Sequence, residues 1–182
     1  MIRWFAPILC LSIGCSHTSN LPTYGVVPDF DLIAQDGRQF HSASELSGNI
    51  WVADFIFTNC PGVCPRMTSQ MRQVQEAVAK MPNVRLVSFT IDPARDTPEA
   101  LTAYAQLHHA MTDRWHFLTG PIPTLNHLDR DVFMLGNVDS SLTHSTRFVL
   151  VDNKSRIRGF YDTSEADSIP KLIAGIRALA HS

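Results

Sequence analysis

The sequence predicts an α/β protein in which helices flank a mixed central sheet, and three observations lead to this assignment. Apolar runs at residues 50–57, 84–91 and 147–151 have the length of buried strands. Helical spacing of apolar residues, or a clear helix start, follows the first two runs. The chain then closes with a strand hairpin and a last helix over residues 164–180. This order of strands and helices is typical of layered α/β domains.

Length and composition indicate one globular domain with a full-sized core. The chain has 182 residues, of which 45% are hydrophobic and 18% are charged. A formal net charge of -2 gives no basic surface, so we do not expect nucleic acid as a partner. Four cysteines are too few for a disulfide scaffold, and they fall into two pairs.

The first residues resemble a bacterial export signal. Arg3 precedes an apolar stretch that is too short to span a bilayer. The residues before Cys15 resemble a lipobox, although Ser12 stands where leucine is usual. We therefore expect residues 1–14 to be a signal peptide and Cys15 to be the lipidated first residue of the mature protein. A plain signal peptide or an uncleaved anchor is the alternative.

The predicted anchor places the protein in the bacterial cell envelope. Residues 15–27 are rich in small polar residues and proline, and we expect them to form a linker after the lipidated end. Residues 28–182 then form the folded domain, on the periplasmic or extracytoplasmic side of a membrane.

The folded part is expected to begin with a hairpin. Residues 28–33 form its first strand, Asp36-Gly37 its turn and residues 39–42 its returning strand. A short turn at residues 44–48 leads into the apolar run at residues 50–57. Apart from Asp54, this run is apolar on both faces, which indicates a central strand that helices cover on both sides.

Helices and strands alternate through the rest of the chain. The helix after the first central strand runs to about Lys80. Thr97 as N-cap, followed by Pro98, starts the next helix. The expected elements are then a helix at residues 98–109, a strand at 114–118, a helix at 123–132, strands at 147–151 and 157–161, and the helix at 164–180.

Cys60 and Cys64 lie where the first central strand turns into a helix. Residues four apart share one helix face, so the two sulfurs can converge, and the helix start lowers a thiol's pKa. The carboxyl end of a central strand is also where an open α/β sheet places its site. Such a pair can form a disulfide or bind a soft metal ion. A purely structural disulfide is disfavoured, because so short a loop removes little unfolded-state entropy.

Three motifs carry a resemblance to a known family: CPGVCP at residues 60–65, TIDPARDTP at residues 90–98, and HS at residues 144–145 ahead of FVLVD. In this order they resemble the SCO/SenC family, whose members are membrane-tethered proteins implicated in copper delivery to cytochrome c oxidase. The resemblance extends from about residue 28 to the C-terminus. It implies a thioredoxin-like fold, with the predicted hairpin as an addition at its N-terminal end.

The resemblance also implies a copper site formed by Cys60, Cys64 and His144. Thiolates favour copper(I) and imidazole suits copper(II), so both oxidation states remain open. Three ligands are one fewer than a structural zinc site uses, whereas an open position suits a carrier. A lone histidine before a strand is more often a locally bonded loop residue. This fold, however, places the strand at residues 147–151 beside residues 50–57, and so brings His144 to the thiols.

Asp92 and Asp96 belong to the acidic motif of the family. They follow the strand at residues 84–91 on the side of the sheet that carries the thiols. They either orient the ligands without binding the metal, or they organise the turn and cap the next helix with Arg95 as a partner.

These features predict an exported copper chaperone. It would pass one copper ion to the copper-binding subunit of cytochrome c oxidase or to another periplasmic copper protein, as a carrier rather than an enzyme. The alternative is a thiol-disulfide oxidoreductase that keeps the oxidase cysteines reduced, with Cys60 and Cys64 as its redox-active pair and Cys60 as the nucleophile. Thioredoxin-like oxidoreductases carry a cis-proline ahead of the later strand, and this chain has no proline between Pro123 and Pro170. A thiol-based redox sensor or peroxidase and a thiol-independent interaction module are further alternatives.

Overall fold

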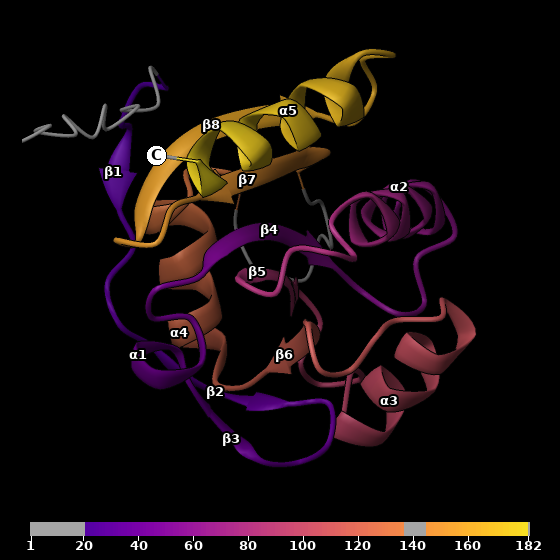
Figure 1. The fold of residues 1–182 in the computed structure, drawn as a ribbon. Coiled ribbons are helices and arrows are strands. Elements are labelled where there is room, and N and C mark those ends of the chain that lie inside the picture. The colour runs from indigo at the N-terminus through magenta and orange to yellow at the C-terminus, as the bar shows by residue number, and fades with distance from the viewer. Residues whose placement is uncertain (1–20, 137–144, 182) are drawn as a thin grey trace, which may run out of the picture.

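The structure, a computed structural model, describes residues 21–136 and 145–181 and has one central sheet between two layers of helices (Figure 1). Its strands lie in the order β1-β8-β7-β4-β5-β6-β2-β3. The three strands β4, β5 and β6 are parallel, and the other pairs are antiparallel. The strands are β1 (Gly25–Val26), β2 (Asp31–Ala34), β3 (Gln39–His41), β4 (Ile50–Ile56), β5 (Val84–Thr90), β6 (Trp115–Thr119), β7 (Arg147–Val151) and β8 (Arg156–Asp162). This mixed α/β architecture confirms the predicted fold class.

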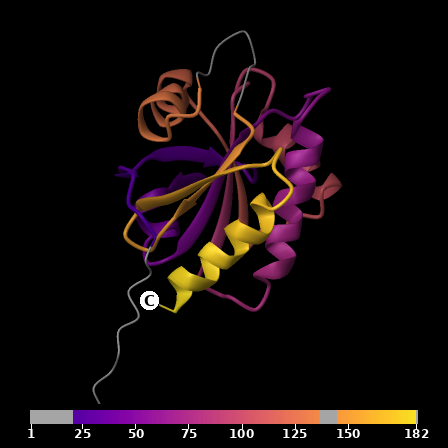
Figure 2. The same cartoon turned by 90° about the horizontal axis from the view of Figure 1, so that it is seen from above.

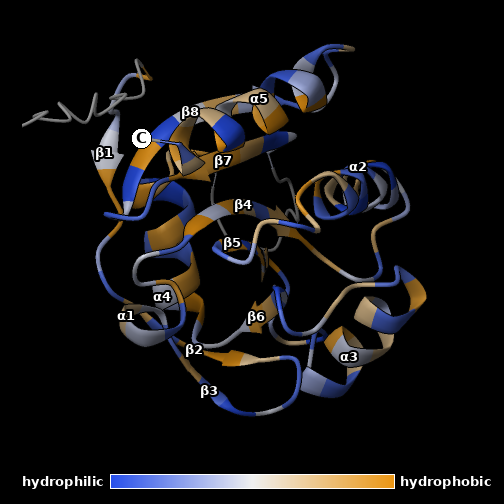
Figure 3. Ribbon diagram, in the orientation of Figure 1, coloured by the Kyte–Doolittle hydropathy of each residue, from blue (hydrophilic) through white to orange (hydrophobic). Residues whose placement is uncertain are grey.

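The helices cover both faces of the sheet (Figure 2). The helical elements are α1 (Ser42–Glu45), α2 (Cys64–Ala77), α3 (Pro98–Leu107), α4 (Ile122–Asn126), the π-helix η1 (His127–Val132) and α5 (Ser168–Ala180). On one face, Phe133 at the end of η1 contacts Trp51, Phe55 and Phe89 of the central strands. On the other face, Tyr104 of α3 packs edge-on against the ring of Phe117 in β6. Apolar residues gather along the strands and on the inner sides of the helices (Figure 3).

The central strands agree closely with the sequence prediction. Every residue of β4 is buried, as expected for a strand that helices cover on both faces. β7 pairs with β4, with Val149 opposite Ala53, so the predicted neighbour of the first central strand is confirmed. The predicted hairpin is also present, and Gly37 in its turn has a φ of 79°, which glycine adopts without strain.

Several boundaries differ from the prediction for local reasons. The helix expected from Ser164 begins at Ser168, because an earlier start would place Pro170 inside the helix and remove a hydrogen bond. The helix expected at residues 123–132 begins at Ile122 and continues as η1, closed by a bond of 2.8 Å from the Phe133 amide to the Leu128 carbonyl. The helix expected to reach Lys80 ends at Ala77.

Two segments near the N-terminus have a different structure from the one predicted. Ser42, expected to end a strand, starts α1, and its hydroxyl accepts the Phe30 amide at 2.8 Å. Gly25–Val26, expected to lie in the linker, form β1 and pair with Ile157 and Arg156 of β8. The ordered domain therefore starts before residue 28.

Candidate metal centre

The two thiols lie at the carboxyl end of β4, where the chain turns into α2. Cys64 is the first residue of α2 and is fully buried, whereas Cys60 is partly exposed. Neither forms a disulfide within the part of the chain that the structure describes. Pro61 and Gly62 between them are exposed to solvent. The Cys60 side chain is therefore partly accessible from solvent, whereas the Cys64 side chain is buried.

The surroundings of the two sulfurs give them different acidities. Burial opposes ionisation of Cys60, but hydrogen bonds from the Cys64 amide and thiol and from the Gly62 and Val63 amides outweigh it and lower its pKa. For Cys64, burial dominates and raises the pKa, and only the Phe57 amide offsets part of this effect. Cys60 is thus the readier thiolate, and Cys64 ionises once another charge, such as a metal ion, compensates it.

Asp96 connects the loop before Cys60 to the neighbouring strand. Its carboxylate is 1% exposed and accepts hydrogen bonds from the Thr58 hydroxyl and the Thr90 hydroxyl, each at 2.5 Å. The Thr58 amide also donates to it, at 3.2 Å. A buried carboxylate with three donors is rigid. Asp96 therefore fixes the chain two residues before Cys60.

Asp92 serves mainly the turn after β5. Its carboxylate pairs with Arg95, and its own amide donates to the Thr90 hydroxyl at 2.9 Å. The N-cap of α3 is Thr97, which accepts the Ala100 amide at 3.3 Å, as the sequence predicted. Of the two acidic residues, Asp96 is the one bonded to the segment that leads to the thiols.

His144 and Cys15 lie outside the described residues. The residues that follow His144 enter the sheet at the end that carries Cys60, because β7 runs antiparallel to β4. The Thr146 carbonyl accepts the Thr163 amide at 2.9 Å, and the Thr163 carbonyl accepts the Gln70 side-chain amide of α2 at 3.0 Å. Across residues 21–136 and 145–181, no three histidine, cysteine or acidic side chains come together to hold a metal ion.

A buried acid that the sequence analysis gave no role, Asp54, lies in the middle of β4. It is 0% exposed, and neither carboxylate oxygen has a hydrogen-bond partner. Burial raises its pKa to about 7, and Ser88, opposite it in β5, offsets little of this. Asp54 also disfavours the Cys64 thiolate electrostatically. Its one signal in the sequence is its place as the only charged residue of an apolar strand.

Comparison with protein-family models identifies the family. The model described as SCO1/SenC matches residues 19–181, which is nearly the whole chain. The chain belongs to the SCO1/SenC family. The family membership expected from the three motifs is therefore confirmed.

A curated SCO1/SenC relative and several solved structures are similar to this chain. The SCO1 protein homolog of Bacillus subtilis is 43% identical over 113 residues, which cover 62% of this chain and 57% of that protein. A SCO1/SenC family lipoprotein from Bacillus anthracis superposes with a TM-score of 0.80 at 31% identity, over 88% of this chain and 98% of that one. BsSco, from a study of a disulfide switch in this family of cytochrome c oxidase assembly proteins, superposes with a TM-score of 0.78 at 29% identity, over 90% of this chain and 97% of that one.

More distant SCO structures share the fold. ScoI of Bradyrhizobium japonicum, solved with copper bound, has a TM-score of 0.68 at 21% identity, over 85% of this chain and 99% of that one. This likeness supports the thioredoxin-like architecture of the present domain. Among the described helices, none has both the length and the apolar character that crossing a bilayer requires.

Proposed function

We propose that this SCO1/SenC protein is a copper chaperone that carries one copper ion on Cys60, Cys64 and His144 and delivers it to a copper site of cytochrome c oxidase or of another extracytoplasmic copper protein. The observation that carries the proposal is the pair of reduced thiols at the start of α2, one partly exposed and one buried, at the end of the sheet where the chain after His144 enters. Copper-bound ScoI and the oxidase assembly protein BsSco, which share the fold, support it.

The ligand chemistry suits a cargo that must leave again. Two thiolates hold copper(I) strongly, and an added imidazole holds copper(II). Each thiol releases its proton when the ion binds, so binding also overcomes the high pKa of Cys64. The partly exposed Cys60 is the ligand that an acceptor protein reaches first, and transfer then proceeds by exchange of one thiolate at a time.

Asp96 supports this site as a positioning residue rather than as a ligand. Its bonds to Thr58 hold the chain that leads into Cys60. We place the domain on the outer side of a bacterial membrane, attached through a lipid on Cys15. A lipoprotein relative of closely similar structure supports this attachment.

The competing function is a thiol-disulfide reductase that keeps the copper-site cysteines of the oxidase reduced. The observation that favours it is the asymmetry of the pair, since an exposed thiol of lowered pKa beside a buried one suits nucleophilic attack and resolution. Cys60 would attack the target disulfide, and Cys64 would then displace the reduced target and leave a Cys60–Cys64 disulfide. Both functions use the same sulfurs, so His144 is the residue that separates them.

Replacing the imidazole tests the chaperone function directly. His144→Ala should weaken copper(II) binding at least about 100-fold, because one of three ligands is lost, while disulfide exchange stays within about twofold of wild type. Titration of the reduced protein with copper(II), followed by absorption and electron paramagnetic resonance, measures the first quantity. His127→Ala is the matched control, because His127 is exposed and pairs with Asp131 on η1. Unchanged copper(II) binding in His144→Ala would remove the three-ligand site.

A further inference from the structure

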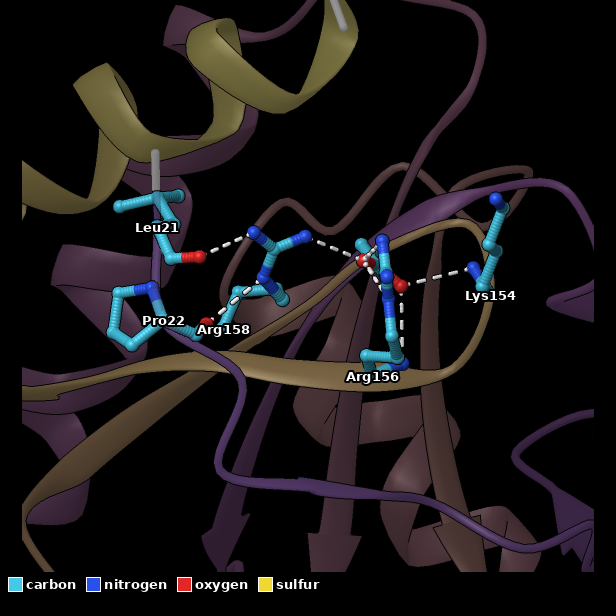
Figure 4. Close-up of polar contacts among 6 residues, drawn as sticks. Leu21, Pro22, Lys154, Arg156 and Arg158 are labelled. Carbon is cyan, nitrogen blue, oxygen red and sulfur yellow. Dashed lines mark hydrogen bonds and ion pairs between the residues drawn. The ribbon is translucent and has the colours of Figure 1, made fainter. Parts of the chain in front are cut away.

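The N-terminal arm, defined here as residues 21–27, is held to the domain by a buried arginine (Figure 4). Arg158 of β8 is 5% exposed. Its Nε donates to the Pro22 carbonyl at 2.9 Å, and one terminal nitrogen donates to the Leu21 carbonyl. The other terminal nitrogen binds Asp152 at 2.7 Å. Hydrogen bonds from a charged donor to buried acceptors are the stronger ones in proteins.

Asp152 fixes the direction of this guanidinium. The carboxylate is 2% exposed, and it accepts the amides of Lys154 and Arg156 at 2.9 and 3.0 Å. The side chain of Arg156 binds it as well, at 2.8 Å. Burial opposes ionisation, but the bonds from both arginines outweigh it and lower the pKa of Asp152. Arg158 is therefore paired and oriented, with its Nε and one terminal nitrogen directed at the arm.

The rest of the arm continues along the edge of the sheet. The Tyr24 amide donates to the Ile157 carbonyl at 2.9 Å, and the Val27 amide donates to the Ser155 carbonyl at 2.7 Å. The ring of Tyr24 packs edge-on against Phe160 at 5.3 Å. Leu21 packs against the core. The arm thus lies along the outer edge of the sheet, and Arg158 binds its first two residues.

The pair formed by Arg158 and Asp152 lies at the opposite end of the sheet from the thiols. Asp152 directly follows Val151, which pairs with Trp51 at the start of β4, whereas Cys60 follows the far end of that strand. Seven residues of β4 at about 3.3 Å each separate the two ends by roughly 20 Å. Figure 2 shows the start of α2 at the top of the molecule and the C-terminal end of α5 at the bottom, where the arm joins the domain.

We propose that Arg158 and Asp152 form an orienting clamp, which makes the membrane attachment leave the domain at the end opposite Cys60 and so turns the thiols away from the bilayer. This rests on the lipid attachment proposed above. A freely jointed linker would let either end of the domain face the membrane. The clamp instead presents the thiols outward, to an acceptor whose copper site stands above the bilayer surface.

Hydrogen exchange tests the clamp itself in the full chain. Arg158→Met removes the donors to Leu21 and Pro22 but leaves Asp152 paired with Arg156, so the domain is expected to fold. The amides of Tyr24 and Val27 should then exchange at least about tenfold faster than in wild type. The matched control is Arg156→Met, which removes the other arginine of Asp152 and no bond to the arm carbonyls. Equal exchange in wild type and Arg158→Met would overturn the clamp.

Energy transfer tests the orientation. A fluorophore is attached to Cys60 in a Cys64→Ser background, in the lipidated full chain on vesicles that contain an acceptor-labelled lipid. Transfer should be low with Arg158 present and rise at least twofold in Arg158→Met, because the released domain samples both orientations. Equal transfer in the two proteins would overturn the orientation. Failure to attach to vesicles would overturn the lipid anchor and the orientation that rests on it. Faster exchange in Arg158→Met together with no copper binding by the wild type would overturn the copper-carrying function and leave the clamp standing.

Discussion

Asp54 shows how one buried group can dominate the pH dependence of a domain. Its carboxyl lies in the middle of β4 at 0% exposure, without a hydrogen-bond partner. An ionised carboxylate in such a place costs several kcal/mol, so the folded protein keeps the proton up to a pH of about 7. The unfolded chain releases the same proton near the ordinary value of 3.8. A site that binds thiolates close by also benefits from a neutral neighbour, because a second negative charge would repel them.

This difference predicts that Asp54 destabilises the reduced, copper-free protein at high pH. Between pH 3.8 and about 7 the folded state binds more protons at this group than the unfolded state, so the free energy of unfolding falls as pH rises. The shift of about 3 pKa units corresponds to about 4 kcal/mol, complete above pH 7. Asp54→Asn should therefore gain up to that amount relative to wild type between pH 4 and pH 8. Urea unfolding at both pH values measures it.

A second variant separates the charge from the side-chain shape. Asp54→Leu also removes the titrating group, and it should show the same relative gain between the two pH values even if its packing changes the absolute stability. Parallel pH profiles for wild type and both variants would show that Asp54 is ionised in the folded protein at neutral pH.

At the scale of elements, Asp96 joins the ends of two strands to the loop that carries the thiols. β4 ends before Thr58 and β5 ends at Thr90, and both hydroxyls donate to this one buried carboxylate. Its removal would leave the buried Thr90 hydroxyl, the partly buried Thr58 hydroxyl and the Thr58 amide without this acceptor. The loop before Cys60 would then lose its attachment, although the helix that follows it would remain.

We therefore expect Asp96→Ala to lower the free energy of unfolding by about 3 kcal/mol and to weaken copper binding about tenfold or more. Denaturant unfolding and copper titration measure the two effects. Thr97→Ala is the control from the next position: it removes the N-cap of α3, should cost about 1 kcal/mol, and should leave copper binding unchanged. If both variants weaken copper binding equally, Asp96 acts through general stability and not through the loop.

The elements that the sequence predicted well are those in which a single physical rule dominates. Full burial on both faces made β4 an uninterrupted apolar run, and Thr97 with Pro98 marked the start of α3. The π-helical bonding of η1 was not predictable, because one extra residue in so short a helix leaves no clear mark on the spacing of the apolar residues. β1 was missed because its two residues gain their structure only from pairing with β8.

Some residues of the candidate site could be predicted from local sequence features, and others could not. Cys60 and Cys64 were found from their spacing and from their place at a strand end, which are local features. The bonds from Asp96 to Thr58 span 38 positions of the chain, so the sequence left its role open between the site and the turn. Asp54 was visible as a charge in an apolar strand, but the complete burial that raises its pKa depends on the packing of several elements.

At the scale of the whole molecule, the thiols and the N-terminal arm lie at opposite ends of the sheet. The thiols lie at the carboxyl end of the central strands, and the arm is locked at the other end by Arg158. The contact between Arg158 and Pro22 joins residues 136 positions apart, so no local pattern in the sequence could indicate it. Small polar residues and proline predicted a linker over residues 15–27. Part of this segment instead pairs its backbone groups with β8, which its composition does not indicate.

This difference gives a prediction about where the domain begins. The sequence places its start at residue 28, whereas the ordered arm extends it to Leu21. A chain that begins at Ser19 keeps the acceptors of Arg158 and the strand β1, and it should unfold at the same urea concentration as the full protein.

A chain that begins at residue 28 lacks the Leu21 and Pro22 carbonyls, so Arg158 keeps its bond to Asp152 and loses these two acceptors. It also lacks β1, so the edge of β8 is uncovered. Its free energy of unfolding should fall by about 3 kcal/mol, and its free edge should promote self-association, visible by size-exclusion chromatography. Identical unfolding midpoints for the two chains would mean that the arm rests on the domain without stabilising it.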